Sequence, residues 1–174
     1  LTNYEGIGFD EAVEVYGKLF QQAIRRRLPK DEHFCVPLSG GRDSRHILLA
    51  LNSEGVRPKF TATVTYRPPS TNQDAKIAAQ LSAELGIDHT ILERTTNWHD
   101  AVLKDIQLTN YSGAGHSWIL PLAAYLQDRV NTSYDGLAGD ILSSGYGMSR
   151  HKMSLIESAE YEQFSRELLS EGGK

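Results

Sequence analysis

The sequence has 174 residues, and 40% of them are hydrophobic, which is enough to form the core of one globular domain. Its 18 basic and 22 acidic residues give a formal net charge of -4, which excludes a general electrostatic attraction to nucleic acids and anionic membranes. The single cysteine, Cys35, excludes a disulfide framework and a multi-cysteine metal site, and no apolar stretch approaches the roughly 20 residues that cross a bilayer. We therefore expect a cytoplasmic protein with a small ligand and with neither a nucleic acid nor a membrane as its partner.

The first third of the chain predicts a helix, followed by a strand, a tight turn and a second helix. Apolar residues recur at helical spacing over residues 10–27, with acidic residues in the first turn and arginines at the end. Residues 34–38 form a short apolar run that is typical of a buried strand. A serine and two glycines at 39–41 interrupt this run, and the helix that follows should end near Gly55.

The rest of the chain alternates between predicted strands and predicted helices. Thr71 and Asp74 have the spacing of a capping box, and the helix that they open should end at Gly86. The other predicted elements are strands over 59–66 and 87–92, a last strand that ends near 134–137, and helices over about 97–108 and 117–130. This alternation predicts an α/β fold, a doubly wound and mainly parallel sheet with helices on both faces.

Three segments are expected along the chain. Residues 1–30 should form a leading amphipathic helix, 31–150 the ligand-binding domain, and 151–174 a C-terminal helical segment. In an open parallel sheet, ligands bind beyond the carboxyl ends of the strands, where the connecting loops gather. Two glycine-containing loops, 39–44 and 136–140, are predicted to lie at this edge.

The loop 39–44 has the composition of an anion-binding cradle. Its two glycines allow the backbone to turn tightly and to approach a ligand closely, because neither has a Cβ. Amides at the start of the following helix carry partial positive charge, and the hydroxyls of Ser39 and Ser44 add donors. Asp43 would repel a bare phosphate, but its carboxylate could hold Mg²⁺ against phosphates. The loop therefore predicts binding of a metal-nucleotide complex.

A simpler interpretation of the same loop is a tight strand-to-helix turn in which Ser39 or Asp43 caps the helix. The patterns G-x-x-x-x-G-K-[ST] and G-x-G-x-x-G are both absent from the sequence, which argues against a Walker-type NTPase and a dinucleotide-binding protein. The histidines have no H-E-x-x-H or similar spacing, so no zinc site is expected.

Three segments, in the same order along the chain, resemble known motifs. Residues 37–44 (PLSGGRDS) resemble the S-G-G-x-D-S loop of the PP-loop ATP pyrophosphatases. Residues 74–93 are similar to a helix-strand stretch of asparagine synthetases that ends in Leu-Gly, two residues and a histidine, here His89. Residues 134–146 (YDGLAGDILSSGY) are similar to the G-x-G-x-D-E-x-x-x-G-Y loop of that family. The chain thus resembles the synthetase domain of asparagine synthetases, with residues 31–150 as a PP-loop domain of the adenine nucleotide alpha hydrolase-like type.

The resemblance implies an amide-forming ligase that uses ATP and Mg²⁺. In that family, an acceptor carboxylate becomes an acyl-adenylate with release of pyrophosphate, and an amine then displaces AMP. The implied partners are a small carboxylate acceptor, an amine donor and, in a longer chain, a glutaminase domain. The resemblance assigns no catalytic residue to this sequence.

Position by position, the resemblance assigns three groups of binding residues. The residues for ATP and pyrophosphate are Leu38, Ser39, Gly40, Gly41, Asp43, Ser44, Val64, Thr65 and Gly136. The residues for Mg²⁺ are Asp43 and Asp140, and the segment for the acceptor contains Thr109, Ser112, Gly113 and His116. For His116, a purely structural role is the alternative.

The sequence departs from the family pattern in and after the second loop. Leu137 stands where the family has a glutamate proposed to handle the proton of the attacking amine, and Ile141 replaces a second acid. The family's pyrophosphate-neutralising lysine lies farther downstream than Lys152, so we expect the chain to be a piece of a longer protein. The alternatives are therefore a lactam- or peptide-cyclising relative and a non-catalytic nucleotide-binding module. An RNA-modifying PP-loop enzyme is not expected, because it would need a basic surface or additional cysteines, and the sequence shows neither.

Overall fold

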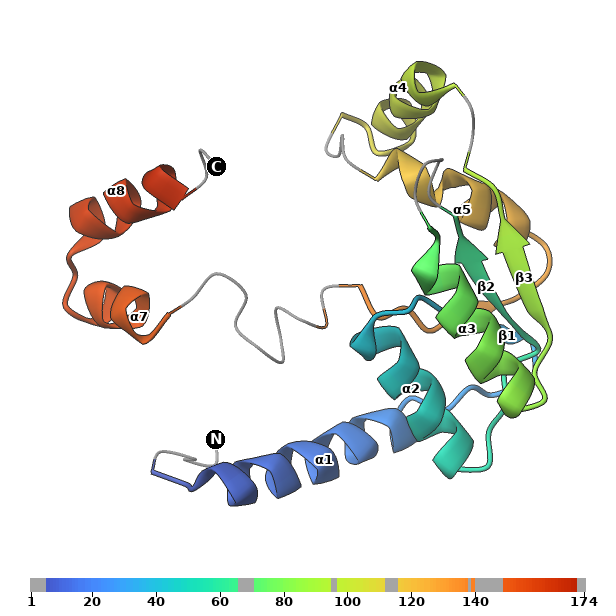
Figure 1. Ribbon diagram of the computed structural model, residues 1–174, viewed down its shortest axis with the longest axis horizontal. Coiled ribbons are helices and arrows are strands. Elements are labelled where there is room, and N and C mark those ends of the chain that lie inside the picture. Colours follow the sequence, from blue (N-terminus) through green and yellow to red (C-terminus); the bar gives the residue numbers. More distant parts are fainter. Residues whose placement is uncertain are drawn as a thin grey trace. The chain divides into compact units, whose positions relative to one another are not determined.

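The computed structural model divides the chain into two units, Leu1–Gly136 and Leu137–Lys174 (Figure 1). The first unit contains a four-stranded sheet and its helices, and two helices are described in the second. The residues that the structure describes are 6–65, 71–94, 97–111, 116–137, 139 and 149–171. Among these residues, no helix has both the length and the apolar character that a membrane span requires.

The sheet has the strand order β3-β2-β1-β4, and each strand is parallel to its neighbours. The central strand β1 (Phe34–Pro37) pairs with β2 (Phe60–Val64) on one side and with the short β4 (Thr132–Ser133) on the other. β3 (His89–Leu92) pairs with the outer side of β2. Because all four strands run the same way, the loops that follow them lie at one edge of the sheet.

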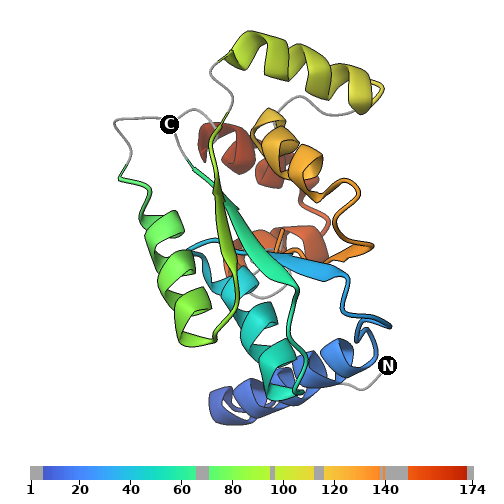
Figure 2. The same ribbon diagram turned by 90° about the vertical axis from the view of Figure 1, so that its right-hand side faces the viewer.

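Helices cover both faces of this sheet. The helices of the first unit are α1 (Phe9–Arg25), α2 (Arg42–Ser53), α3 (Gln73–Glu84), α4 (Trp98–Leu108), the 3-10 helix η1 (Ser117–Ile119) and α5 (Leu120–Leu126). Val36 of β1 shares a buried cluster with Leu48 of α2 and Ala78 of α3. The adjacent Cys35 points to the opposite face and shares a second buried cluster with Leu122 of α5. Figure 2 shows α3 and α5 on opposite sides of the strands, which confirms the predicted doubly wound α/β fold.

The two helices next to the predicted ligand loops end as the sequence predicts. Beyond α2, Gly55 has a φ of +74°, and its N–H and that of Val56 donate to carbonyls of the last helical turn at 3.0 Å each. Beyond α3, Gly86 has a φ of +65°, and its N–H and that of Ile87 do the same at 3.1 and 2.9 Å. Glycine adopts this left-handed conformation without steric penalty, which explains why both helices stop there.

Two local predictions were wrong, and a third was close. The capping box does not form, because the N-cap of α3 is Asn72, which has a φ of 48° and makes no side-chain cap. The helix predicted over 117–130 starts as a 3-10 turn and ends at Leu126, before Asp128 takes a φ of 63°. The last strand, Thr132–Ser133, ends one residue before the predicted range of 134–137, and the Tyr134 N–H continues the pairing by donating to the Cys35 carbonyl at 3.0 Å.

The second unit contains α7 (Arg150–Glu157) and α8 (Tyr161–Glu171). The side chain of Ser149 caps α7 by accepting a hydrogen bond from the Lys152 N–H at 3.2 Å. Between the helices, the His151 Nε2 lies 3.1 Å from the Glu167 carboxylate, and this contact lowers the pKa of Glu167. Both groups are on the surface, so the pair contributes little to stability.

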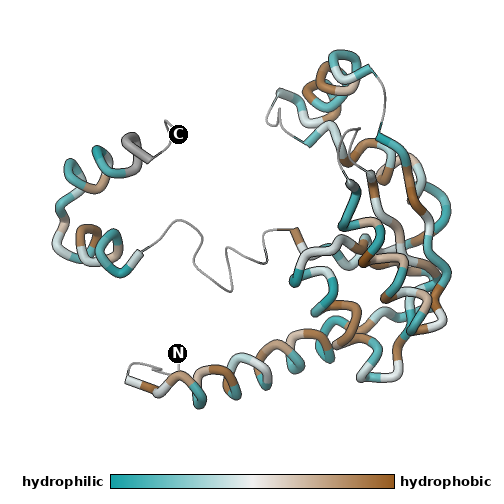
Figure 3. Tube along the Cα trace, viewed as in Figure 1, coloured by the Kyte–Doolittle hydropathy of each residue, from teal (hydrophilic) through white to brown (hydrophobic). Residues whose placement is uncertain are grey.

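α1 packs on α2 through its C-terminal half. The rings of Phe20 and His46 stack with centroids 3.8 Å apart, and Ile24 is buried in the core. Apolar residues recur along the whole helix (Figure 3), but toward its start Phe9 and Val13 are 82% and 54% exposed. The amphipathic helix predicted over 10–27 is thus present.

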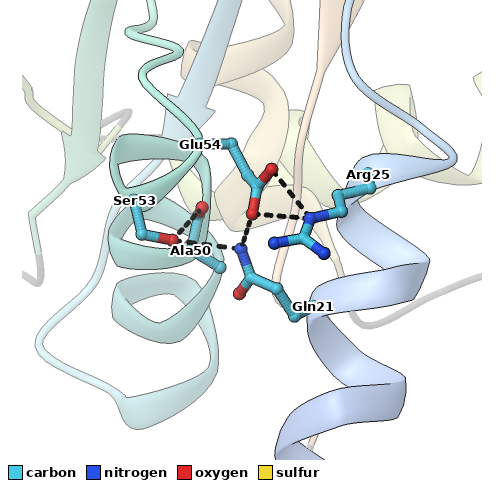
Figure 4. Close-up of polar contacts among 5 residues, drawn as sticks. All are labelled: Gln21, Arg25, Ala50, Ser53 and Glu54. Carbon is cyan, nitrogen blue, oxygen red and sulfur yellow. Dashed lines mark hydrogen bonds and ion pairs between the residues drawn. The ribbon is translucent and has the colours of Figure 1, made fainter.

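Polar side chains fix the same end of α1 to the end of α2 (Figure 4). The Arg25 Nε donates to both carboxylate oxygens of Glu54 at 2.9 Å, and the Gln21 amide donates to one of them and to the Ser53 hydroxyl. The hydrogen bond from Arg25 and then that from Gln21 lower the pKa of Glu54. This carboxylate is therefore more stable ionised in the folded chain than in the unfolded chain.

We expect Glu54→Gln to lower the midpoint of thermal unfolding at neutral pH. Because the pKa of Glu54 is lowered on folding, its stabilisation is complete above the ordinary glutamate pKa of about 4.3 and is lost as pH falls through the lower, folded-state value. The wild type and the variant should therefore converge in acid, which circular dichroism melts over a pH series would measure. The control is Glu14→Gln, whose exposed pair with Lys18 at 3.6 Å should matter little. Equal losses in both variants would contradict the prediction.

Candidate functional site

The loop 39–44 follows β1 directly and leads into α2, which begins at Arg42. It therefore lies at the carboxyl edge of the sheet, as predicted. Gly136 follows β4 and reaches the same edge, because a Cβ built on it would lie 2.6 Å from the Ser44 nitrogen and 3.0 Å from the Asp43 carbonyl carbon. The structure thus brings the beginning of the second loop onto the first turn of α2.

The two serine side chains close the turn. The Ser44 hydroxyl oxygen accepts the Ser39 N–H at 3.0 Å, the two hydroxyl oxygens lie 2.9 Å apart, and the Ser39 oxygen accepts the Gly41 N–H at 3.1 Å. Ser44 is buried, with 5% of its surface exposed. If its hydroxyl donates to Ser39, the Ser39 hydrogen is left to donate outward. In either direction this contact uses one hydroxyl hydrogen, so at most one of the two serine hydroxyls remains to donate to a bound anion.

The simpler interpretation, in which Ser39 or Asp43 caps α2, is wrong. The N-cap residue is Gly41, and no side chain caps this end of the helix. Asp43 lies in the first turn, is half-buried, and has no hydrogen-bond or ion-pair partner among the described residues. Among the described residues, neither helix capping nor an ion pair accounts for the Asp43 carboxylate.

Gly40 is required by space rather than by backbone conformation. A Cβ on Gly40 would lie 2.4 Å from the Asp74 Oδ1 and 2.8 Å from the Asp74 Cα. These separations are shorter than real Cβ contacts, so the loop keeps its position only with glycine there. A loop held this closely, with no Cβ over its backbone, fits the close approach of a phosphate group.

Asp74 is the residue at this edge that the sequence prediction missed. It was predicted to cap α3, but it lies in the first turn of that helix, half-buried against Gly40 and without a hydrogen-bond or ion-pair partner among the described residues. The order of the elements could have indicated Asp74. α3 is the helix that follows β2, so the start of α3 lies at the same edge of the sheet as residues 39–44. Asp74 thus joins Asp43, which lies within the loop, as a carboxylate at this edge, and the described residues hold no cluster of three metal-ligating side chains.

The residues predicted to frame adenine lie at the ends of β1 and β2. The Leu38 side chain is buried, its N–H donates to the Ala62 carbonyl at 2.8 Å, and its carbonyl accepts from the Thr63 hydroxyl. The Thr65 N–H donates to β3 at 2.8 Å, so the backbone groups of Val64 point the other way, toward β1. Because the last β1 residue paired with β2 is opposite Ala62, Val64 lies beyond the end of β1.

The predicted acceptor segment is described only at its two ends. The Thr109 hydroxyl donates to the Asp105 carbonyl at 2.8 Å at the end of α4. The His116 N–H donates to the buried Asp105 carboxylate at 3.2 Å, and the His116 ring lies edge-on to Trp118. Asp105 thus ties the end of α4 to the start of η1. Ser112 and Gly113, like Asp140 and Ile141 of the second loop, lie outside the described residues.

Comparison with known proteins bears on the resemblance carried by the three motifs. The family model for asparagine synthase matches residues 16–172, which include both ligand loops. No curated protein and no solved structure matches the chain. The family match covers most of the sequence and agrees with the parallel α/β fold. The chain therefore belongs to the asparagine synthase family.

Proposed function

We propose that the chain binds Mg-ATP and forms AMP and pyrophosphate as it adenylates a carboxylate for amide formation. Membership of the family indicates an ATP-dependent synthetase domain. The observation that carries the finer proposal is the close packing of Gly40 against Asp74 and of Gly136 against Ser44. This packing leaves a turn of bare backbone at the start of α2, which suits a pyrophosphate group.

The residues of the loop would divide the work of binding ATP. Backbone amides at the start of α2 and the Ser39 hydroxyl would hold the β- and γ-phosphates. Mg²⁺ would be held by Asp43 and, as the resemblance implies, by Asp140; when bound, it would neutralise charge on the phosphates. Asp74 adds a third carboxylate near Gly40. The backbone of Val64, which lies beyond the end of β1, would contact the adenine edge.

This division of roles requires no covalent help from the protein. Reaction at the α-phosphorus depends on the alignment of the acceptor carboxylate with the leaving pyrophosphate and on neutralised charge. Thr109, Ser112, Gly113 and His116 are the proposed acceptor contacts. The Asp105 carboxylate would position the His116 end of this segment rather than touch the acceptor.

The experiment that tests this proposal is calorimetry with Mg-ATP and with pyrophosphate. Asp43→Asn should weaken Mg-ATP binding about tenfold, which corresponds to one lost charged contact. In EDTA the same substitution should not weaken binding of metal-free ATP, because it removes a negative charge near the phosphates. The control is Asp10→Asn, which changes the matching second residue of α1. A folded wild type that binds neither ligand at millimolar concentration would overturn the proposed function.

A second candidate function rests on Leu137, which follows Gly136 and whose side chain is 61% exposed. Where the resemblance places an amine-handling glutamate, this chain presents an apolar surface group. A lactam- or peptide-cyclising relative, in which substrate and amine belong to one molecule, would accommodate this difference. Product analysis with carboxylates that carry an internal amine would distinguish ring closure from amide formation with free ammonia.

A further inference from the structure

A chain of polar side chains crosses the sheet from α3 to the start of the candidate ATP-binding loop. The Ser82 hydroxyl of α3 lies 2.7 Å from the Thr61 hydroxyl of β2, which lies 2.8 Å from the Nδ1 of His89 on β3. The Nε2 of the same ring lies 3.4 Å from the Thr63 hydroxyl, and Thr63 donates to the Leu38 carbonyl. Ser82 and Thr61 have no exposed surface, and Thr63 is 5% exposed.

The directions of the hydrogen bonds in this chain follow from the last one together with a neutral His89 ring. Thr63 has a single hydroxyl hydrogen, which it gives to the Leu38 carbonyl, so it can only accept from His89. The Nε2 must therefore carry the ring hydrogen. Burial lowers the pKa of His89, which favours the neutral ring, and its Nδ1 then accepts from Thr61. Thr61 in turn accepts from Ser82.

The Leu38 carbonyl is the point at which this chain acts on the loop. Leu38 links β1 to Ser39, and its carbonyl belongs to the peptide unit that leads into the turn. Its side chain is buried, and its N–H is held by the Ala62 carbonyl at 2.8 Å. With the Thr63 hydroxyl on its carbonyl, both backbone groups of Leu38 are fixed on the β2 side, and the loop must leave β1 in one direction.

We propose that His89, as its Nε2–H tautomer, is a positioning residue that holds the Leu38 carbonyl through Thr63 and so sets the loop for nucleotide binding. The proposal rests on the proposed function, and no contact between His89 and the nucleotide is required. It explains why a threonine faces each ring nitrogen of a histidine within a parallel sheet, where apolar side chains would otherwise be expected.

The first test is independent of any nucleotide. Nitrogen-15 NMR of the wild type at neutral pH should show His89 as a neutral ring with its hydrogen on Nε2. Thr63→Val should move the carbonyl carbon-13 shift of Leu38, and Thr63→Ser should restore it. A ring with its hydrogen on Nδ1, or a Leu38 shift that ignores the loss of the Thr63 hydroxyl, would overturn the proposed chain.

The second test links the chain to binding. Thr63→Val and His89→Phe should each weaken Mg-ATP binding about tenfold, and the double variant should lose no more than either, because both break one path. Thr63→Ser should restore affinity. The control is Thr90→Val on β3 of the same sheet. It removes a hydroxyl that lies 3.0 Å from the Tyr125 hydroxyl of α5, and it should leave the affinity for Mg-ATP unchanged.

The outcomes separate this inference from the proposed function. Wild-type protein that binds no Mg-ATP overturns the proposed function, and with it the role of His89 in binding. Wild-type binding with unchanged affinity in Thr63→Val and His89→Phe overturns this inference alone. So does an equal loss in Thr90→Val, because the effect would then be one of general stability.

Discussion

Gly136→Ala should weaken Mg-ATP binding at least about tenfold and destabilise the fold by about 1–3 kcal/mol. A Cβ at this position would lie 2.6 Å from the Ser44 nitrogen and 3.0 Å from its Cα. Both atoms belong to the backbone of α2, which cannot rotate away as a flexible side chain would. Gly136 would have to move away from the first turn of α2, and its proposed contact with ATP would separate from those of residues 39–44. Calorimetry would measure the affinity, and urea unfolding the stability.

Gly17→Ala is the matched control for this substitution. Gly17 lies inside α1, and a Cβ there would meet no atom within 4 Å. Alanine favours a helix interior over glycine, so this variant should be more stable by up to about 1 kcal/mol and should bind nucleotide normally. A Gly136→Ala protein that binds Mg-ATP as tightly as Gly17→Ala would show that the contact between the loops does not shape the site.

The sequence was sufficient to predict the fold because its signals are local. The apolar run of β1, the glycines that end α2 and α3, and the alternation of strands and helices each depend on neighbouring residues only. Where local signals competed, the prediction failed. Thr71 and Asp74 had the spacing of a capping box, but the chain enters α3 through Asn72 in a left-handed conformation.

The site was predicted less completely, for a different physical reason. The predicted binding residues of the loop 39–44 are consecutive in the sequence. The position of this loop at the sheet edge could be predicted from the strand that precedes it. The role of Asp74 depends on where α3 starts relative to Gly40, which is a contact between distant segments. The Thr61 and Thr63 contacts with His89 depend on the register of β2 with β3, in which Thr61 lies opposite His89. Register is a property of the assembled sheet, and local periodicity does not specify it.

The assembled turn also shows what the two serines of the loop do before any ligand is bound. Both hydroxyl oxygens accept backbone N–H groups of the turn, and the contact between the two hydroxyls uses one of their two hydrogens. The turn is thereby preorganised before a ligand arrives, which reduces the ordering cost of binding.

Leu48→Ala should destabilise the first unit by about 2–5 kcal/mol, the largest effect on stability that we expect from one substitution. Leu48 has no exposed surface and belongs to the core that joins β1 to α1, α2 and α3. The control is Leu49→Ala: the adjacent side chain on the same helix is 46% exposed, so its loss should cost less than about 1 kcal/mol. Urea unfolding followed by circular dichroism would measure both. The difference between the two variants also tests the candidate site. Burial of the Leu48 face fixes the rotation of α2 about its axis, and this rotation determines on which side of the helix Asp43 lies. If both substitutions destabilised the fold equally, α2 would be turned from the position described, and the half-buried position of Asp43 in its first turn would have to be abandoned.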